Sequence, residues 1–355
     1  MVRVAFLGDI ALFADETLSG NWQLKFHEVA RVLAKYDLVV ANLEAPITNC
    51  NHTMVCKGIH LKTTSAIIDV LKMLNVGIVS LSNNHACDFG IKGLADTIQA
   101  LNKAGIKYYG VNGKSETIII KGERFVFHGY CCYSANGAHY TTKDTKYGIH
   151  ALTAERILTD LKSDKALDGL SVLSLHWGDE YSSYPNKRQV KLMHELTKNY
   201  KFILHGHHTH AMQGIEYINS SLLMYSQGNF CFDEVHSTVN KKQCIKQNEI
   251  NRESYILSAD IENSRINQWN TVGVFNSEEK VRLLDNAEKI KSLSECIQHC
   301  EEDQYEMESK QMIARQKTAN LGKKDFWWLM SKMNYYSIGA KILYYRNKRL
   351  YNKAF

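Results

Sequence analysis

Proline is scarce in this sequence, where Pro46 and Pro185 are the only two among 355 residues. A proline-rich linker between domains is therefore excluded. No uninterrupted apolar run reaches the length of a membrane-spanning helix, and the opening residues Met1–Asp9 lack the long apolar run and cleavage site of a signal peptide. From these absences we expect a cytoplasmic protein that is at most peripheral to a membrane.

Cysteine is present but shows no pairing pattern. The nine cysteines are an odd number, and no two of them have the spacing Cys-x-x-Cys. Such scattered residues are typical of free thiols in a reducing compartment and do not indicate a disulfide framework.

Most of the chain has almost no net charge. Residues 323–355 contain eight lysines and arginines but only one aspartate, so the net charge of +6 lies almost entirely in this segment. A nearly neutral body is not typical of a protein that binds duplex nucleic acid, and we expect no nucleic-acid partner. Hydrophobic residues at 45% and charged residues at 23% are ordinary for a globular protein and exclude whole-chain disorder.

Short apolar runs rich in β-branched residues alternate with helix-like stretches. This alternation predicts an α/β fold made of βαβ units with buried strands. A hairpin is expected at 117–128, and two later runs, 254–261 and 268–275, are expected to complete a mixed sheet. The expected strands are Val2–Leu7, Asp37–Val40, Val76–Leu81, Ser171–Leu175, Phe202–Leu204 and Leu222–Tyr225, and the expected helices are Lys25–Lys35, Thr64–Leu74, Gly93–Ala104, Ala154–Leu161 and Lys187–Asn199.

The composition changes after residue 277. Residues 278–311 are highly charged, favour helix and contain neither glycine nor proline. Beyond them, aromatic residues are interleaved with lysine and arginine. We therefore predict a body over residues 1–277 and a helical, aromatic and basic extension over residues 278–355.

The end of the extension has an apolar helical pattern. Trp328, Tyr335 and Ile342 repeat at seven-residue spacing, with Leu329 and Tyr336 beside them, which predicts an apolar stripe on one face of a helix. Such a stripe can pack on the body of the same chain, on a second copy in a homo-oligomer, or on an anionic membrane surface. Stacking on nucleic acid is a further alternative that the nearly neutral body disfavours.

Polar residues follow the expected strands at the point where each strand ends. In open α/β sheets, ligands bind beyond the carboxyl ends of the strands, so one edge of the sheet would collect these side chains. Imidazoles mixed with carboxylates and an amide are suitable ligands for Mn, Fe or Zn ions. The residues concerned are Asp9, Glu44, Asn84, His85, His176, His208 and His210.

The segment His205–His210 has four histidines in six positions. A histidine-rich surface turn is the alternative interpretation. In an extended chain alternate side chains share a side, so His208 and His210 are expected to form a pair and His207 to face elsewhere.

Each of the other polar turns also has a simple structural interpretation. Asn83–His85 could be a turn or a helix N-cap, and Gly8–Asp9 is common turn chemistry. His176 could be a buried core histidine beside Trp177. A metal centre is the interpretation that explains all of these turns together.

Six blocks of sequence together resemble a known family. They are Gly8–Asp9, Ala41–Thr48, Ser82–Gly90, His176–Tyr181, Gly206–His210 and Tyr225–Phe230, in that order. In this order they resemble the signature blocks of the bacterial capsule-synthesis CapA (poly-γ-glutamate capsule) family, a branch of the calcineurin-like metallophosphoesterases. The resemblance covers residues 3–235 and not the C-terminal third. It implies a four-layer αββα sandwich with a two-metal centre.

The resemblance also implies a role for individual residues. Asp9 and His210 would hold one ion, Glu44 would bridge both ions, and Asn84, His176 and His208 would hold the other. His85 would give a proton to the leaving oxygen, and Asp88 would orient His85. Asn42, His207 and Asn229 are candidates for further ligands or substrate contacts.

The sequence departs from the wider superfamily in two places. The usual Asp-x-His of the first block is Asp9-Ile10-Ala11 here, without an imidazole, and Glu44 stands where Asp is more usual. Asn42 is a candidate for the missing ligand.

The resulting functional hypothesis is a metal-dependent phosphoesterase-like hydrolase with two divalent ions, Mn, Fe or Zn. It would act on a phosphorylated or polymeric surface-glycan or poly-γ-glutamate substrate during capsule or surface-polysaccharide synthesis. The alternative is a non-hydrolytic assembly factor that uses the fold to bind polymer or partners. Acyl transfer is not supported, because no serine or cysteine nucleophile with a recognisable base stands out.

Overall fold

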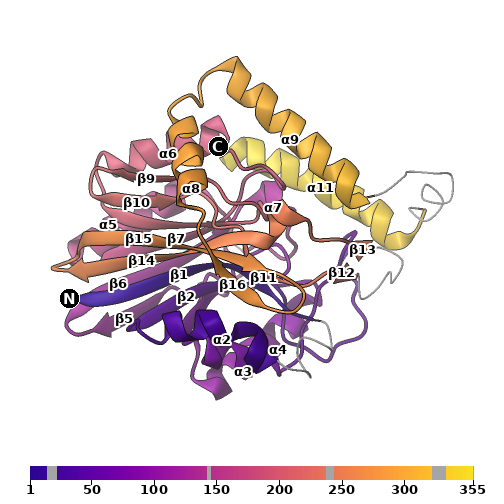
Figure 1. Ribbon diagram of the computed structural model, residues 1–355. Coiled ribbons are helices and arrows are strands. Elements are labelled where there is room, and N and C mark those ends of the chain that lie inside the picture. Colours follow the sequence, from indigo (N-terminus) through magenta and orange to yellow (C-terminus); the bar gives the residue numbers. More distant parts are fainter. Residues whose placement is uncertain (14–21, 142–144, 237–243, 322–332, 355) are drawn as a thin grey trace.

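Two β-sheets lie face to face in the computed structural model, and helices cover both outer faces (Figure 1). The structure describes residues 1–13, 22–141, 145–236, 244–321 and 333–354. The predicted four-layer αββα arrangement is confirmed by this order of helices, sheet, sheet and helices.

The first sheet has eight strands in the order β16-β15-β14-β1-β2-β3-β4, and β11 pairs with β1 beside this path. The strands β1 to β4 are parallel to one another, whereas β14, β15 and β16 are antiparallel to their neighbours. The bounds are β1 Val2–Ala11, β2 Leu38–Leu43, β3 Val76–Ser80, β4 Lys107–Tyr109, β11 Asn229–Phe232, β14 Glu253–Glu262, β15 Arg265–Asn276 and β16 Val281–Leu284.

The second sheet has six strands in the order β5-β6-β7-β8-β10-β9. The predicted hairpin is present as the antiparallel pair β5 and β6, while β6, β7, β8 and β10 are parallel. Its bounds are β5 Glu116–Ile120, β6 Glu123–Cys131, β7 Leu170–His176, β8 Phe202–His207, β9 Ile215–Ile218 and β10 Ser221–Met224; a separate small pair is β12 Val235–His236 with β13 Cys244–Ile245.

Side-chain alternation along the strands explains the layers. Val4 and Phe6 of β1 face the core between the two sheets, whereas Ala5 and Leu7 face the helices outside the first sheet. The outer helices are α2 Trp22–Leu33, α3 Ile67–Met73 and α4 Gly90–Ala104 on the first sheet, and α5 Ala154–Ala166 and α6 Lys187–Thr197 on the second; short helical turns are η1 Tyr133–Ala135 and α7 Glu249–Arg252.

Residues beyond 277 begin with a strand. The expectation of helix from residue 278 is wrong for β16, because Val281–Leu284 pairs with β15 at the edge of the first sheet. Helix α8, Ala287–Ile297, then contributes Ile290 to the core between the sheets. The division into units 1–277 and 278–355 stays a prediction.

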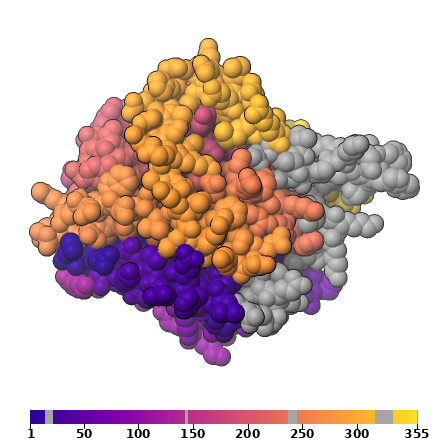
Figure 2. Space-filling model, in the orientation of Figure 1, coloured from indigo at the N-terminus to yellow at the C-terminus, as the bar shows by residue number. Residues whose placement is uncertain are grey.

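The last two described helices are α9, Asp303–Leu321, and α11, Tyr335–Ala354. Helix α11 lies against the body of the same chain, where the Tyr336 hydroxyl donates to the carbonyl oxygen of Thr53 at 3.0 Å. Figure 2 shows residues of α8 and α9 across one face of the molecule, with part of α11 beside α9. Among the described residues, no helix is both long enough and apolar enough to cross a bilayer.

The predicted stripe faces the body only in part. Trp328 and Leu329 lie outside the described residues, and Ile342 is exposed. The hydroxyls of Tyr335 and Tyr336 donate to the carbonyl oxygens of Met54 and Thr53. The side that faces the body also carries the buried Asn347, whose Nδ2 donates to the carbonyl oxygen of Gly137 at 3.1 Å, a polar contact that an apolar repeat cannot reveal.

Candidate metal centre

Strand register brings the predicted site residues to one edge of the two sheets. In the first sheet, Asp9 of β1 lies opposite Asn42 of β2 and Asn229 of β11. In the second sheet, His176 at the end of β7 lies opposite His207 at the end of β8. The carboxyl ends of the parallel strands therefore supply a common site between the sheets.

Asp9, Glu44 and His176 form the centre of this site. One ligand atom of each residue lies within 4.8 Å of the ligand atoms of the other two. His176 Nε2 is 3.7 Å from Glu44 Oε1, and all three side chains are buried. Two carboxylates and an imidazole in contact are ligand types that Mn, Fe and Zn accept.

Asn84, His208 and His210 surround this centre. Asn84 Oδ1 is 3.0 Å from His176 Nε2, and the ring centroids of His208 and His176 are 4.7 Å apart. His210 Nε2 is 3.9 Å from Glu44 Oε1. The structure thus brings together all six residues for which the resemblance implies a metal-binding role.

Asn42, His207 and Asn229 contact the same cluster from its outer side. Asn42 Nδ2 donates to Asp9 Oδ1 at 2.8 Å, and His207 Nδ1 lies 2.8 Å from the same oxygen. Asn229 Oδ1 is 2.9 Å from His210 Nδ1. Contacts of this kind orient the side chains that face a metal.

The position of His207 differs from the expectation that it faces elsewhere. That expectation assumes an extended chain, but φ is +91° at His208 and +55° at His210. Strand β8 ends at His207, and the bent backbone that follows removes the simple alternation of sides. His207 is therefore buried against Asp9, on the same side as the rest of the cluster.

Two glycines allow the backbone to pass close to the site. A Cβ on Gly8 would lie 2.1 Å from the carbonyl oxygen of Gly228, and a Cβ on Gly206 would lie 1.9 Å from that of Tyr225. Both distances are far shorter than any real contact of a Cβ atom, so a side chain at either position would push the strands apart. Each glycine is adjacent in sequence to a site residue, Asp9 or His207.

The pKa values of the two central carboxyl groups are shifted in opposite directions, although both groups are buried. Burial opposes the ionisation of Asp9, but the neighbouring histidines, His207 above all, lower the pKa of Asp9 well below its usual value. Burial raises the pKa of Glu44 well above its usual value, and the negative charge of Asp9 raises it further. A cation at the centre would favour the ionised form of Glu44.

Several buried polar atoms at the centre have no hydrogen-bond partner among the described residues. They include both carboxylate oxygens of Glu44 and Nδ1 of His208. A buried polar atom without a partner costs roughly 1–3 kcal/mol of stability. Divalent ions would provide partners for atoms of these types, so the residues present fit a metal centre.

His85, Asp88 and Lys57 form a second buried group beside the centre. His85 Nδ1 is 2.6 Å from Asp88 Oδ2, and Lys57 Nζ donates to Asp88 Oδ1 at 2.7 Å. Burial would raise the pKa of Asp88, but the charges of His85 and Lys57 lower it to about 2. Asp88 is therefore ionised at neutral pH and holds His85 through Nδ1, which leaves Nε2 available.

Two residues of this region have roles that the sequence reasoning misses. Asn83 Nδ2 donates to the carbonyl oxygen of Leu43 at 2.8 Å, and Asn83 Oδ1 accepts from the backbone N–H of His85 at 3.1 Å. Its position within the Asn83–His85 turn was the available signal. Lys57 belongs to residues 51–62, which form no helix or strand, and no local pattern indicates its contact with Asp88.

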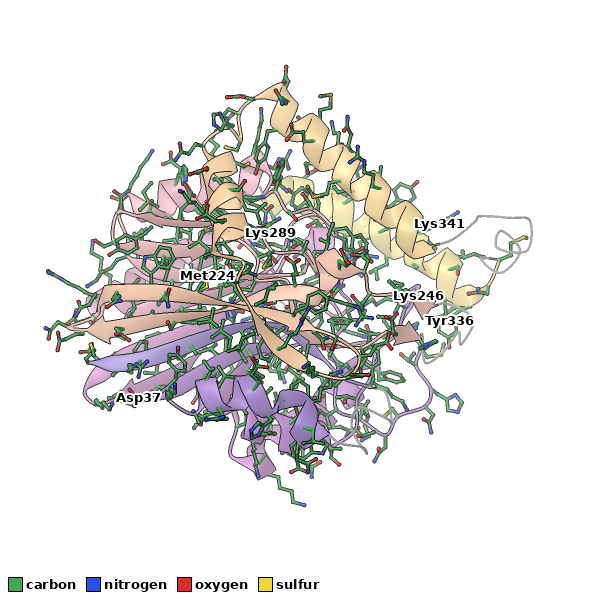
Figure 3. The ribbon with its side chains drawn as sticks, viewed as in Figure 1. Asp37, Met224, Lys246, Lys289, Tyr336 and Lys341 are labelled. Atoms are coloured by element: carbon green, nitrogen blue, oxygen red, sulfur yellow. The ribbon has the colours of Figure 1, made fainter. Side chains whose placement is uncertain are left out.

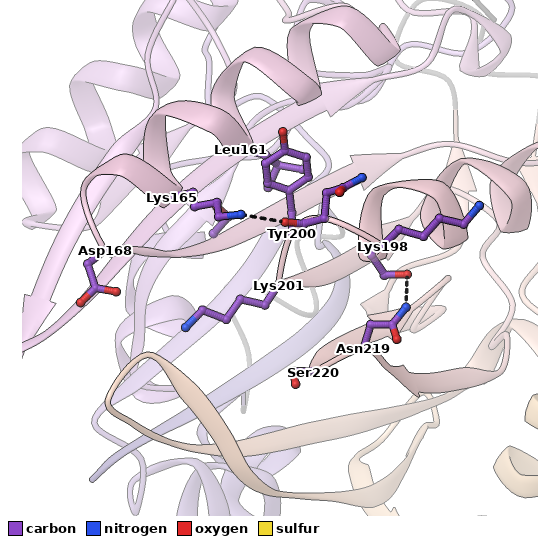
Figure 4. A pocket seen from close by; sticks show the side chains of 12 residues that line it. Leu161, Lys165, Asp168, Lys198, Tyr200, Lys201, Asn219 and Ser220 are labelled. Carbon is purple, nitrogen blue, oxygen red and sulfur yellow. Dashed lines mark hydrogen bonds between the residues drawn. The ribbon is translucent and has the colours of Figure 1, made fainter.

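A separate hollow of about 750 Å³ lies at the opposite ends of the strands (Figure 4). Its lining includes Gly169, Lys201 and Ser220, which directly precede β7, β8 and β10. Lys165, another lining residue, donates to the carbonyl oxygen of Asn199 at 3.3 Å. The lining contains no histidine, and the predicted site residues lie at the other edge of the sheets.

Comparison with known proteins identifies the family. A family model described as "Bacterial capsule synthesis protein PGA_cap" matches residues 3–234, which is more than half of the chain. The chain belongs to the PGA_cap family. The matched region contains all of the site residues described above.

Two curated proteins are similar to this PGA_cap chain over most of the same region. The "PGA biosynthesis protein CapA" of Bacillus subtilis strain 168 is 30% identical over 245 residues, an alignment that covers 66% of this chain and 64% of the relative. The "Capsule biosynthesis protein CapA" of Bacillus anthracis is 28% identical over 222 residues, which covers 59% of this chain and 54% of the relative. The alignments therefore span less than two thirds of either relative.

Among solved structures, the PGA_cap chain is similar to a 5'-nucleotidase precursor from Thermus thermophilus. The two chains are 14% identical with a TM-score of 0.44, and the match covers 90% of this chain and 59% of the other.

Proposed function

We propose that this protein is a metal-dependent, phosphoesterase-like hydrolase that acts in capsule or poly-γ-glutamate synthesis. The observation that carries the proposal is the buried Glu44 carboxylate, which lies next to Asp9 and His176. Both of its oxygens lack a hydrogen-bond partner among the described residues. A carboxylate in this position is stabilised most directly by cations. Membership of the PGA_cap family supports the link with capsule synthesis.

The residues of the centre divide into two functions. Asp9, Glu44, Asn84, His176, His208 and His210 would hold divalent ions, a pair by the family resemblance, with Mn, Fe and Zn all compatible with this ligand set. When bound, such ions lower the pKa of water and stabilise negative charge on a phosphoryl group.

His85 is the proton donor in this proposal. Its Nδ1 contacts the ionised Asp88, so Nε2 would give a proton to the leaving oxygen when the ring is doubly protonated. Burial lowers the pKa of His85, and the charge of Asp88 opposes this shift. Lys57 holds Asp88 from the other side and also donates to the carbonyl oxygen of Asn84 at 2.6 Å. The same lysine therefore ties the proton donor to a residue of the metal centre.

The substrate proposed is a phosphorylated or polymeric surface glycan or poly-γ-glutamate. The names of the two CapA relatives support capsule polymer synthesis as the process in which the substrate arises. A non-hydrolytic assembly factor would need the same fold and polymer contact but no turnover, so an activity measurement separates the two functions.

The test is hydrolysis of bis(para-nitrophenyl) phosphate by protein prepared without a histidine tag and loaded separately with Mn²⁺, Fe²⁺ or Zn²⁺. We expect His208→Ala to lose metal and activity together. We expect His85→Asn to keep its metal but lose about a hundred- to ten-thousand-fold in kcat, the usual contribution of a positioned proton donor. His299→Asn, at an exposed histidine paired with Glu302, is the matched control and should be unchanged.

Two results would overturn this proposal. One is a metal-loaded wild-type protein that is no faster than His208→Ala. The other is metal uptake that His208→Ala leaves unchanged. Metal uptake without turnover would instead favour the assembly factor.

A further inference from the structure

Helix α11 presents two different faces. Its inner face contacts the body through Tyr336 and through Asn347, whose Nδ2 also donates to Asn136 Oδ1 at 3.0 Å. Figure 3 shows Tyr336 on one side of the helix and Lys341 on the other. The inner contacts hold the helix in place, so the outer face has a defined orientation.

The outer face carries an exposed apolar stripe. Ile338 and Tyr345 are 57% and 68% exposed. Ile342 is 67% exposed and also lines a hollow between α11 and Val55 of the body. The spacing of four and three residues places all three on the same side of a helix. Scattered apolar residues are normal on a surface, but three large ones in register along one helix mark an interaction surface.

Cations flank this stripe. Helix α11 contains five lysines and arginines and no acidic residue: Lys341, Arg346, Lys348, Arg349 and Lys353. All five are exposed, and none forms an ion pair with any carboxylate in the part of the chain that the structure describes. The outer face of α11 therefore combines apolar side chains with positive charges that no described carboxylate pairs with.

We propose that the outer face of α11 binds an anionic membrane surface. Isoleucine and tyrosine side chains of an interfacial helix enter the boundary between headgroups and acyl chains, and lysine and arginine contact the lipid phosphates. Charge selects this occupant over a second copy of the chain. A symmetric contact would place the same cations opposite one another, whereas anionic lipid complements them.

This inference is independent of the proposed hydrolysis, but it places the metal centre near the membrane. Asn347 of α11 bonds to Gly137, and a Cβ on Gly137 would lie only 3.3 Å from the Cα of Asn84. The helix that would bind lipid thus packs on the loop beside one of the residues of the metal centre. Substrate delivered at the bilayer surface would be close to that centre.

The test is co-sedimentation of the full chain with vesicles. One set contains phosphatidylglycerol and phosphatidylcholine in equal parts, and the other contains phosphatidylcholine alone. We expect binding to the anionic vesicles only, and weaker binding as salt is raised. Because each cation near an anionic surface contributes about a fivefold factor, Lys341→Glu with Arg349→Glu should weaken binding by at least tenfold.

The apolar part is tested by Ile338→Asp with Ile342→Asp, which should also weaken binding by about tenfold or more. The matched control is Leu24→Asp, because Leu24 is 71% exposed but lies on α2. Circular dichroism of each variant checks that it is folded, and light scattering reports the oligomeric state. The proposal is overturned if the wild type does not bind anionic vesicles or if the α11 variants bind them as well as the Leu24 control does. It is also overturned if the substitutions in α11 instead cause a homo-oligomer to dissociate.

Discussion

Replacing Lys57 by methionine tests the buried group that positions His85. The change removes a cation whose Nζ donates to Asp88 Oδ1 at 2.7 Å while keeping a side chain of similar length. Asp88 is fully buried, and Lys57 is nearly so. Asp88 would retain His85 and the backbone N–H of Leu61, which donates to Oδ2 at 2.7 Å.

The magnitude follows from the burial of this pair. Breaking a buried ion pair by removing one partner typically costs about 3–5 kcal/mol, because the remaining charge stays buried. The lowering of the Asp88 pKa to about 2 from an unfolded value of 3.8 corresponds to about 2 kcal/mol of stability. This stability is present above the unfolded pKa and is lost as pH falls through the folded pKa. We therefore expect a loss of about 3 kcal/mol at neutral pH.

The assay is urea unfolding in the presence of a chelator, so that metal binding does not contribute. Lys62→Met is the matched control, because Lys62 lies in the same segment and bonds to Asn51 near the surface; it should cost less than about 1 kcal/mol. Asp88→Asn and the double variant Lys57→Met, Asp88→Asn complete a double-mutant cycle. A Lys57→Met loss below that of Lys62→Met, or single-variant losses that simply add, would refute the reasoning.

Three further predictions concern stability. Glu44→Gln should raise the melting temperature of metal-free protein, because burial and Asp9 hold the pKa of Glu44 well above its usual value, yet it should abolish metal uptake; a lower melting temperature without metal would contradict this. Burial lowers the pKa of His150 to about 4 from 6.5, so the free energy of unfolding should fall by up to about 3 kcal/mol as pH drops from 6.5 to about 4. Urea unfolding of His150→Gln at several pH values should lack this part of the pH dependence. Asn347→Ala should cost about 1–3 kcal/mol in the same assay, because it leaves the carbonyl oxygen of Gly137 without its donor; an unchanged midpoint would mean that α11 contributes little.

The fold and the outline of the site are accessible from the sequence because both depend on local patterns. Val4–Leu7 of β1 is an apolar run that is followed by Gly8 and the polar Asp9, so the placement of Asp9 near the carboxyl end of the strand follows from the sequence, although the strand continues to Ala11. The same logic applies to His176, the last residue of β7. Because parallel strands end at the same edge of a sheet, the proximity of these residues can be predicted without knowing any side-chain contact.

Other features depend on tertiary contacts that leave no local pattern. Lys57 reaches Asp88 from a segment without helix or strand, across 31 positions of the chain. His207 turns toward Asp9 because the backbone bends after β8, where alternation no longer applies. Asn347 of α11 is buried and bonds to the carbonyl oxygen of Gly137, a contact that an apolar repeat does not indicate.

Equilibrium dialysis of the chelator-treated protein against Mn²⁺ measures directly whether the buried carboxylates and imidazoles hold divalent ions. We expect the wild type to retain close to two ions per chain, as a two-metal centre requires, and Glu44→Gln to retain none. Wild-type protein that retains no more Mn²⁺ than Glu44→Gln would contradict this expectation.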